Sequence, residues 1–303
     1  MPEIREITSG LQFPEGPIAM PDGSVLLVEI QRGTLSRVTP DGKITVVADT
    51  GGGPNGAAIG PDGAVYICNN GGFEWHQFGD MTFPGLQPLN YSGGRIQRVD
   101  LATGAVEDLY TECNGLPLRG PNDIVFDTSG GFWFTDHGKT RERERDRTGV
   151  FYARPDGSLI REVLFPLEAP NGVGLSPDGT RLYVAETPTG RVWHWDISAP
   201  GEVMKAEPVF AGGTLLAGVG GFQMFDSLAV DSAGNVCVAT LINGGITVIS
   251  PDGQSIEHLP MPDMITTNIC FGGPDRRTAY ITLSGTGRLV AMEWPRPGLK
   301  LNY

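Results

Sequence analysis

One short phrase recurs six times along this chain, and this internal repeat limits the possible folds more than any other feature. Each copy has an apolar stretch, a tight turn and a second apolar stretch. The starts lie roughly 40 to 67 residues apart, and units of about 50 residues are typical of propeller blades. The repeat therefore predicts one domain over residues 1–303. The copies read FPEGPIAMPDGSVLLVE from Phe13, PNGAAIGPDGAVYICN from Pro54, PNDIVFDTSGGFWFTD from Pro121, PNGVGLSPDGTRLYVAE from Pro170, FDSLAVDSAGNVCVAT from Phe225 and TNICFGGPDRRTAYIT from Thr267.

Each copy has the pattern of a β-hairpin. Asp-Gly and Ser-Gly pairs supply the positive φ that tight hairpin turns require, and no helical periodicity interrupts the strands. A second hairpin follows most copies, for example from Gly33, Gly94 and Gly149. The prediction is an all-β fold, a six-bladed β-propeller with four antiparallel strands per blade. The last blade lacks one strand, and the N-terminal residues 3–7 are expected to supply it.

Composition narrows the class of partner and the compartment. A net charge of -13 disfavours nucleic acid and anionic membranes, which bind clustered Lys and Arg. The chain has no long apolar run and no Cys-x-x-Cys pair, so we expect a cytoplasmic protein, a monomer or small homo-oligomer. Cys68 and Cys237 lie in apolar strands and are expected to be core residues. The charged run 141–147 is expected to be a solvated loop tip, with a partner contact as the alternative.

One position near the start of each copy varies in chemistry. It opens the strand that lines the channel of a propeller, so the six side chains are expected to meet at one mouth. A second set of residues ends the returning strands and should surround the first set on the same face. The first set is Glu15, Asn55, Asn122, Asn171, Asp226 and Asn268, and the second is Glu29, Asn69, Asp136, Glu186, Thr240 and Thr282.

The two carboxylates of the first set, Glu15 and Asp226, indicate a metal site. Two ionised carboxylates in a narrow channel repel each other, and no Lys or Arg occupies an equivalent position in any repeat. With the amide oxygens of Asn122 and Asn171 they form a hard-oxygen donor set that suits Ca²⁺, and less well Mg²⁺ or Mn²⁺. The alternative is that backbone amides or water satisfy the carboxylates. Asn55 and Asn268 are also typical turn residues. None of the four histidines is at a key position, which disfavours a nitrogen and sulfur zinc site: His76, His137, His194 and His258.

With these motifs the chain resembles the family of gluconolactonase, regucalcin (senescence marker protein) and luciferin-regenerating enzyme. The resemblance covers essentially the whole chain and rests on FPEGP, PND, APNG and FDS. It implies that Glu15, Asn171 and Asp226 bind one catalytic divalent cation, which is Ca²⁺, Zn²⁺, Mn²⁺ or Mg²⁺ among family members. It also implies that Asn122 touches metal or substrate and that Asp123 assists catalysis.

One departure from the family bears on the substrate. Animal members carry a substrate-binding Arg where this chain has Gly120, and the nearest arginine is Arg119. The resemblance therefore does not carry over sugar-lactone specificity. We assign Arg119, Asn122 and His137 to substrate binding.

The resulting hypothesis is a divalent-metal-dependent lactonase. The cation would polarise the carbonyl of a small-molecule lactone and activate a water molecule, with Asp226 as first choice for the base and Asp123 as second. Ser227 as a nucleophile is the weaker alternative, and no Gly-x-Ser-x-Gly elbow is present. Two other functions stay open: a phosphotriesterase-like hydrolase, and a non-enzymatic calcium-binding propeller.

An aromatic insertion after Asn69 is expected to cover the metal mouth. Residues 71–86 include Trp75 and three phenylalanines, which is dense for an exposed connection. We predict a lid that gives the pocket an apolar wall, with packing against neighbouring blades as the alternative. A second insertion from Gly212, before Asp226, would add Phe222 to that wall.

Overall fold

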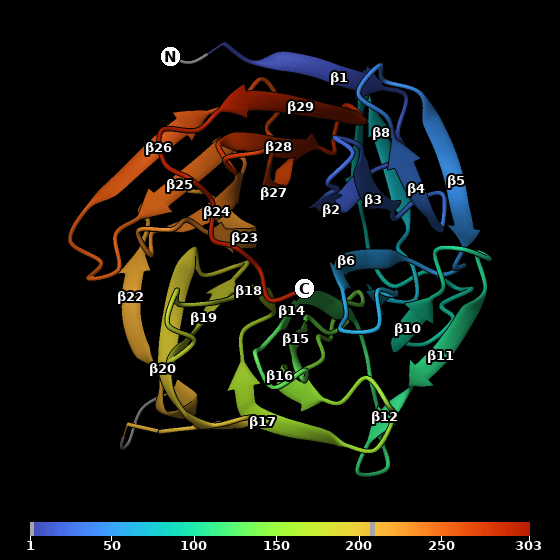
Figure 1. Ribbon diagram of the computed structural model, residues 1–303. Helices are drawn as coiled ribbons and strands as arrows, with labels where there is room; N and C mark the ends of the chain where they lie inside the picture. Colours follow the sequence, from blue (N-terminus) through green and yellow to red (C-terminus); the bar gives the residue numbers. More distant parts are fainter. Residues whose placement is uncertain (1–2, 207–209) are drawn as a thin grey trace.

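The computed structural model describes residues 3–206 and 210–303 and places six antiparallel sheets in a ring around a central channel (Figure 1). This confirms the predicted six-bladed β-propeller. Blade 1 contains β2 (Pro14–Ala19), β3 (Val25–Glu29), β4 (Thr34–Val38) and β5 (Ile44–Asp49). Blade 2 contains β6 (Pro54–Ile59), β7 (Val65–Asn69), β10 (Arg95–Val99) and β11 (Val106–Tyr110). Blade 3 contains β14 (Pro121–Phe126), β15 (Phe132–Asp136), β16 (Thr148–Ala153) and β17 (Ile160–Leu167).

The second half of the chain repeats the arrangement. Blade 4 contains β18 (Pro170–Leu175), β19 (Arg181–Glu186), β20 (Arg191–Ala199) and β22 (Thr214–Gly218). Blade 5 contains β23 (Met224–Val230), β24 (Val236–Leu241), β25 (Gly245–Ile249) and β26 (Ile256–Pro260). Blade 6 contains β27 (Thr266–Gly272), β28 (Thr278–Leu283), β29 (Arg288–Glu293) and β1 (Arg5–Ser9).

Strand β1 closes the ring by pairing with β29, for example Arg5 with Ala291. The predicted closure by the N-terminal strand is therefore confirmed, two residues further along the chain than expected. Closing the ring in this way joins the start of the chain to its last blade, so that no blade is left short of an outer strand.

Blade 4 corrects one prediction. The segment from Gly212 was expected to be an insertion into the mouth, but its residues 214–218 form β22, which pairs with β20 as the outer strand. The segment between these strands contains the short β21 (Glu202–Val203) and the single 3-10 turn η1 (Phe210–Gly212). Only the loop of residues 219–223 remains to connect blade 4 to blade 5.

Two short hairpins lie outside the blades. Strands β8 (Trp75–Phe78) and β9 (Met81–Pro84) pair with each other, and so do β12 (Glu112–Cys113) and β13 (Leu116–Pro117). The first hairpin lies within the insertion that was predicted to be a lid.

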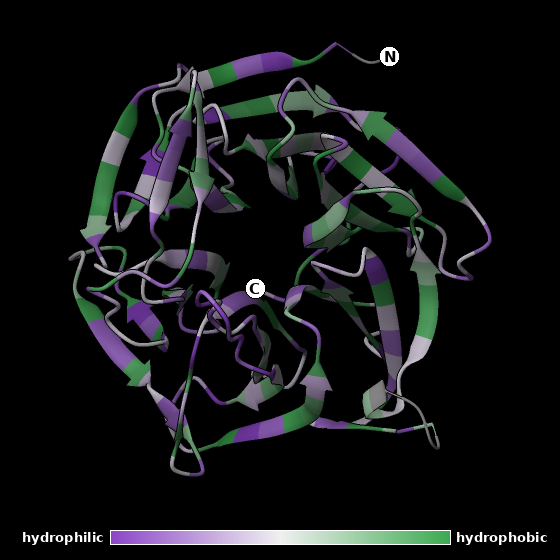
Figure 2. Ribbon diagram, turned by 180° about the vertical axis from the view of Figure 1, so that it is seen from behind, coloured by the Kyte–Doolittle hydropathy of each residue, from purple (hydrophilic) through white to green (hydrophobic). Residues whose placement is uncertain are grey.

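Apolar side chains fill the spaces between adjacent blades. Trp133, Trp195 and Trp294 are fully buried, and Cys68 and Cys237 are buried free thiols, as predicted for core residues. The outermost strands alternate hydrophilic and hydrophobic residues, because one face packs inward and the other meets solvent (Figure 2). Within the described ranges, none of the helical segments has the length and apolar character needed to span a membrane.

The six inner strands share an irregularity where the sequence predicted functional residues. In every blade the pairing between the first and second strands shifts register at or beside the variable residue, for example between Glu15 and Ile18 in blade 1. A bulge re-aims the side chains around it. The bulges therefore allow the variable residues to turn away from regular strand geometry at the end of each blade.

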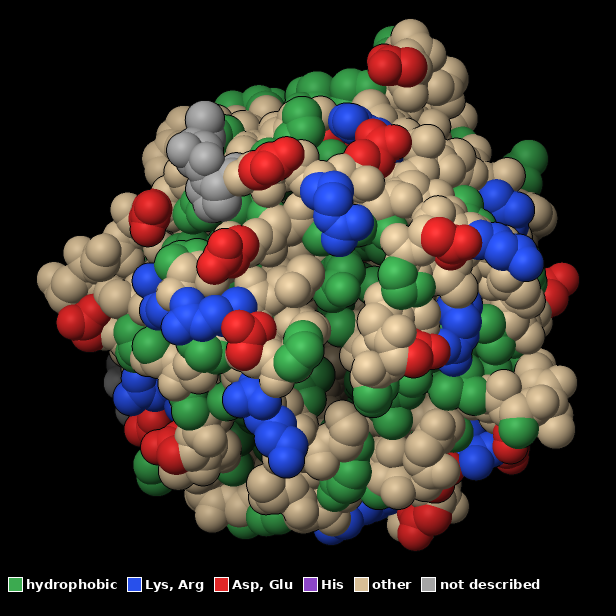
Figure 3. All heavy atoms as spheres, turned by 45° about the horizontal axis from the view of Figure 1, so that its top comes forward, with side chains coloured by type: hydrophobic (Ala, Val, Ile, Leu, Met, Phe, Trp, Pro, Cys, Tyr) green, Lys and Arg blue, Asp and Glu red, His purple; other side chains and the backbone are tan. Residues whose placement is uncertain are grey.

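A cavity of about 1170 Å³ occupies the channel, and it is walled mainly by apolar residues of the inner strands. The C-terminal segment crosses one end of this channel in Figure 1. Leu299 N–H donates to Val230 O of blade 5, and Asn302 Nδ2 donates to Phe126 O of blade 3. Hydrophobic side chains gather around the hollow at the middle of the molecule in Figure 3.

Candidate metal centre

The variable residues lie at the start of the six inner strands, which contact one another in order around the channel. Five of them are buried, and Asp226 is half-buried. In each blade, the start of the first strand lies beside the end of the second strand, as the hairpin geometry predicted. The observed pairs next to them are Pro14 with Glu29, Pro54 with Asn69, Pro121 with Asp136, Pro170 with Glu186, Phe225 with Thr240 and Asn268 with Thr282.

Glu15 is a buried carboxylate without a basic partner. Its Oε2 accepts hydrogen bonds from Asn268 Nδ2 and from its neighbour Gly16 N–H, both at 2.7 Å. Burial and the negative charge of Asp226 raise the pKa of Glu15 well above its usual range. The two carboxylates therefore act on each other across the ring, from strands more than 200 residues apart.

Asp226, in blade 5, is likewise a carboxylate without a described basic partner, and only blade 6 separates it from Glu15 in blade 1. Burial raises its pKa to about 7, although a hydrogen bond from the Asn171 side chain acts in the opposite direction. Asn171 Nδ2 also donates to Thr187 Oγ1 at 3.0 Å, and its Oδ1 accepts a long 3.4 Å hydrogen bond from Ser227 Oγ. The structure thus brings Glu15, Asn171 and Asp226 into one electrostatically coupled cluster.

Asn122 contributes an oxygen that has no partner. Its Oδ1 is buried and accepts no hydrogen bond, although buried oxygens are normally paired. None of the described Lys or Arg side chains forms an ion pair with Glu15 or Asp226. An unpaired amide oxygen and two repelling carboxylates fit a hard divalent cation.

The candidate ligands of the cation include uncharged amide side chains as well as carboxylates. In residues 3–206 and 210–303 no group of three or more His, Cys, Asp and Glu side chains is placed to hold a metal ion. A cation at this ring would therefore depend on the amide oxygens of Asn122 and Asn171 as well as on its two carboxylates.

Asp123 differs from the four candidate ligands in position. It is buried and lines the channel cavity, whereas none of Glu15, Asn122, Asn171 and Asp226 does. Burial raises its pKa to about 7, and backbone hydrogen bonds oppose that rise. Its predicted role as an alternative base stays a prediction.

The second set of residues anchors the loops that lead into the inner strands. Glu29 Oε2 accepts from Gln12 N–H at 2.7 Å, and Asp136 accepts from Arg119 N–H and Gly120 N–H, each at 2.7 Å. Glu186 Oε1 accepts from Glu168 N–H in the same way at 2.8 Å. Sequence reasoning placed these residues correctly but did not identify this role, because the acceptor and its donors lie about 16 residues apart.

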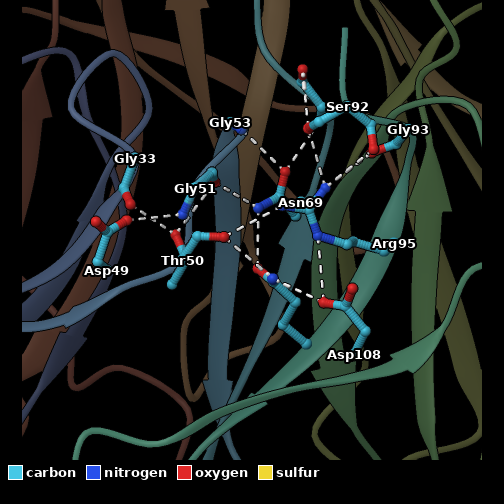
Figure 4. Close-up of polar contacts among 12 residues, drawn as sticks. Gly33, Asp49, Thr50, Gly51, Gly53, Asn69, Ser92, Gly93, Arg95 and Asp108 are labelled. Carbon is cyan, nitrogen blue, oxygen red and sulfur yellow. Dashed lines mark hydrogen bonds and ion pairs between the residues drawn. The ribbon is translucent and has the colours of Figure 1, made fainter.

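Asn69 shows the same role in blade 2 (Figure 4). Its Oδ1 accepts from Gly53 N–H at 2.9 Å and Gly71 N–H at 3.0 Å, and its Nδ2 donates to Gly51 O and Gln97 Oε1. Arg95 adds a hydrogen bond to Thr50 O and an ion pair with Asp108. This network fixes the loop before Asn55 and the first residues of the aromatic insertion together.

The predicted substrate-binding residues of blade 3 lie beside Asn122. His137 is half-buried, and its backbone N–H donates to Gly120 O at 2.8 Å. Burial lowers the pKa of its imidazole ring to about 3, so the ring is neutral at physiological pH. Arg119 is exposed, and its backbone carbonyl accepts from Tyr91 Oη at 2.5 Å.

The aromatic insertion packs across the mouth side of the ring. Trp75 and Phe73 join a cluster with Phe13 and Ile30 of blade 1 and Ile265 of blade 6. The Trp75 ring centroid lies 5.0 Å from that of Phe13, which precedes Glu15 by two residues. The insertion therefore packs against neighbouring blades, as the alternative interpretation expected, and its role as a lid over the metal mouth stays a prediction.

Two details of the mouth were not expected. Lys139 is almost fully buried, and its Nζ donates to Gly72 O at 2.6 Å and Asn70 Oδ1 at 3.1 Å beneath the Phe73 ring. The charged run is not wholly a solvated tip, because Arg141 is half-buried. Its guanidinium pairs with Asp146 at 2.7 Å and donates to Gln87, the residue that follows the insertion. Phe222, by contrast, is 79% exposed and packs into no wall.

Six blades around a channel, with two carboxylates and two amides gathered where inner strands begin, define a six-bladed β-propeller with a candidate oxygen-ligand metal centre. The sequence model of the family described as SMP-30/Gluconolactonase/LRE-like region matches residues 13–285. The chain belongs to this family.

Similar proteins have been characterised under related names. A gluconolactonase of Zymomonas mobilis is 27% identical over 93% of this chain and 79% of its own length. Lactonase drp35 of Staphylococcus saprophyticus is 30% identical over 86% of this chain and 73% of its own. Among solved structures, a calcium-binding regucalcin of Agrobacterium tumefaciens has a TM-score of 0.74 and 20% identity, covering 99% of this chain and 98% of that one. The structural likeness establishes the shared fold.

The raised pKa values of the carboxylates give stability a defined pH dependence. In the metal-free folded protein, Asp123 and Asp226 hold their protons up to pH about 7, whereas the unfolded chain releases them near the ordinary value of 3.8. Between these two values the folded state binds more protons, so the free energy of unfolding falls as pH rises. A divalent cation that binds the ionised carboxylates would offset this loss.

We therefore expect the stabilisation by Ca²⁺ to grow as the pH rises from about 5 to about 7 and then to level off. The measurement is the midpoint of thermal unfolding, with saturating Ca²⁺ and with chelator, at each pH. Taking the difference cancels the contribution of groups that do not contact the cation. A difference that stays constant over this range would contradict the expectation.

Proposed function

We propose that this protein is a divalent-metal-dependent lactonase that hydrolyses a small-molecule lactone at the mouth of the propeller channel. The observation that carries the proposal is the pair of mutually repelling carboxylates, buried Glu15 and half-buried Asp226, together with the buried, unpaired oxygen of Asn122. Membership of the family and the similarity to a gluconolactonase and to lactonase drp35 support the reaction class.

The proposed ligands are Glu15, Asn122, Asn171 and Asp226, and the proposed cation is Ca²⁺. All four supply hard oxygen donors, and two carry negative charge, which suits Ca²⁺ better than a metal that prefers nitrogen or sulfur. Zn²⁺, Mn²⁺ and Mg²⁺ are the alternatives that reconstitution would compare. When bound, the cation would polarise the lactone carbonyl and lower the pKa of a water molecule.

The residues of the chain supply the remaining parts of the mechanism. Asp226 is the best placed base for the attacking water, because it is the only one of the four proposed ligands that is not fully buried. Its carboxylate can accept a proton only when it is ionised, and the hydrogen bond from Asn171 both orients it and favours that form. The same proton can later be returned to the departing alkoxide of the opened ring.

The wall of the mouth suggests which lactones fit. Trp75 and Phe73 are half-buried aromatic residues that pack in one cluster with Phe13, two residues before Glu15. His137 has a neutral ring, and its backbone N–H donates to the carbonyl of Gly120, two residues before Asn122. We propose that these side chains contact the substrate and favour a lactone bulkier or less polar than gluconolactone. Arg119, which is exposed, stays a predicted substrate contact, whereas the exposed Phe222 is not part of the proposed wall.

A panel of lactones assayed by proton release tests the proposal. The panel contains gluconolactone, bulkier lactones of the same ring size and, in parallel, a phosphotriester. We expect turnover of at least one lactone, loss of about 100-fold or more after chelation, and recovery with Ca²⁺.

The other outcomes point to the other functions. Faster turnover of the phosphotriester than of any lactone would indicate the phosphotriesterase-like alternative. Tight Ca²⁺ binding without turnover of either substrate class would indicate a calcium-binding propeller. Full activity after complete removal of divalent metals would contradict the metal-dependent mechanism.

A further inference from the structure

The residue after the variable position is a carboxylate in blade 3 alone, while blades 5 and 6 have Ser227 and Ile269 there. In blades 1, 2 and 4 it is glycine, and the structure shows why: a Cβ at Gly56 would lie 2.4 Å from Asn122 O, and one at Gly172 would lie 2.6 Å from Leu228 N. Neighbouring inner strands approach too closely there for a side chain. Blade 3 has Asp123 at this position, and its carboxylate extends into the channel cavity.

The Asp123 carboxylate contacts backbone amides of three blades. Its Oδ1 accepts from Ile124 N–H of its own strand at 2.9 Å, and its Oδ2 accepts from Val173 N–H of blade 4 at 3.2 Å. A hydrogen bond from Leu228 N–H of blade 5 adds to these two. Each amide belongs to the residue two positions after a proposed metal ligand: Asn122, Asn171 and Asp226.

These amides are available because of where the inner strands lie. The inner strand of each blade has no partner on its channel side, so part of its backbone N–H groups face the channel. Thr135 Oγ1 strengthens the same junction, since it accepts from Asp123 N–H at 3.1 Å and donates to Asn171 O at 2.6 Å. Blades 3 and 4 are thus joined by side-chain hydrogen bonds directly below the ligands.

We propose that Asp123 is a positioning residue that ties the inner strands of blades 3, 4 and 5 together and so sets the spacing of Asn122, Asn171 and Asp226. A carboxylate buried without a cationic partner is costly unless hydrogen bonds compensate it, and the three amides provide that compensation. The Asp123 carboxylate is engaged by these three amides, whereas a base would have to face a water molecule at the metal. The inference rests on the proposed metal-dependent function.

The test compares Asp123→Asn with Asp127→Asn. The first variant keeps the shape but replaces an acceptor oxygen with an N–H donor that faces backbone N–H groups. Asp127 also lines the channel cavity, but its carboxylate accepts from Ser129 in the turn at the far end of the strand. We expect Asp123→Asn to weaken Ca²⁺ binding, measured by calorimetry, by about 10- to 100-fold, and Asp127→Asn to leave it unchanged.

Activity at saturating Ca²⁺ separates positioning from catalysis. If Asp123 only positions the ligands, excess Ca²⁺ restores kcat of Asp123→Asn to within about threefold of the parent. If Asp123 is the base, kcat stays lower by about 10²–10⁴-fold while Ca²⁺ affinity is unchanged, and this outcome overturns the proposal.

Amide hydrogen exchange gives a readout that requires neither turnover nor a folded variant. In the parent protein the amides of Val173 and Leu228 are expected to exchange at least about 10-fold more slowly than that of Ala57, the equivalent residue of blade 2, where Gly16 of the preceding blade offers no carboxylate. Equal exchange rates would overturn the proposal that Asp123 joins the three inner strands. Absence of lactone turnover with protected amides would instead reject the proposed function and leave the tie in place.

Discussion

Replacing Asp226 with Asn is expected to lower kcat for lactone hydrolysis by about 10²–10⁴-fold, the usual effect of removing a general base. Asn keeps an oxygen that can bind a cation and preserves the size of the side chain, so the propeller should fold and bind Ca²⁺, although more weakly. Steady-state kinetics at saturating Ca²⁺ measures the loss of kcat apart from the loss of metal. Circular dichroism and thermal unfolding establish that the fold is retained.

Ser227→Ala is the matched control for this experiment. Ser227 follows Asp226 directly and is fully buried, and within residues 3–206 and 210–303 the one hydrogen bond of its hydroxyl is the 3.4 Å contact with Asn171 Oδ1. The variant should therefore stay within about threefold of the parent in kcat, because a long neutral hydrogen bond contributes little. Abolished activity in Ser227→Ala, or near-normal activity in Asp226→Asn, would exchange the roles of the two residues and contradict the mechanism.

Replacing Glu15 with Gln is expected to move Ca²⁺ affinity and metal-free stability in opposite directions. Loss of one of the two ligand charges should weaken Ca²⁺ binding by about 100-fold or more, equivalent to about 3 kcal/mol. The same change removes a buried charge that repels Asp226, so the metal-free variant should be more stable than the metal-free parent by about 1–3 kcal/mol. Calorimetry with Ca²⁺ and chemical denaturation in chelator measure the two effects.

Glu29→Gln provides the comparison within the same blade. Glu29 is equally buried, but Ser36 Oγ, Arg32 Nε and Gln12 N–H all donate to it. Neutralising it should lower stability and leave Ca²⁺ affinity nearly unchanged. If Glu15→Gln behaved in the same way as Glu29→Gln, Glu15 would be a structural residue and the candidate metal centre would lose its main support.

Much of the fold and the centre of the site follow from local sequence. Six hairpins of the same pattern can cover one another's apolar faces in a closed ring. Each hairpin then places its first residues at the same end of its blade. For that reason the meeting of Glu15, Asn171 and Asp226 could be predicted without knowing any contact between them. The two carboxylates could be recognised as unusual because the other four copies of the repeat have asparagine at the same position.

Contacts between different blades could not be read in this way. Residues 214–218 looked like an insertion because nothing in their own pattern shows that β20 lacks an outer partner until the blade is assembled. The sequence analysis did not single out Lys139, because its burial depends on a carbonyl and an aromatic ring supplied by the insertion of blade 2.

Hairpin geometry is local, because turn residues and alternating strands lie close together along the chain. It could therefore be predicted from the residue types. It accounts for the blades, the ring and the placing of the acidic pair. The packing of Trp75 on Phe13 and the contacts of Asp123 with Val173 and Leu228 join segments about 50 or more residues apart. Those contacts depend on how the six blades pack against one another in three dimensions, and the local sequence around each residue does not determine that packing.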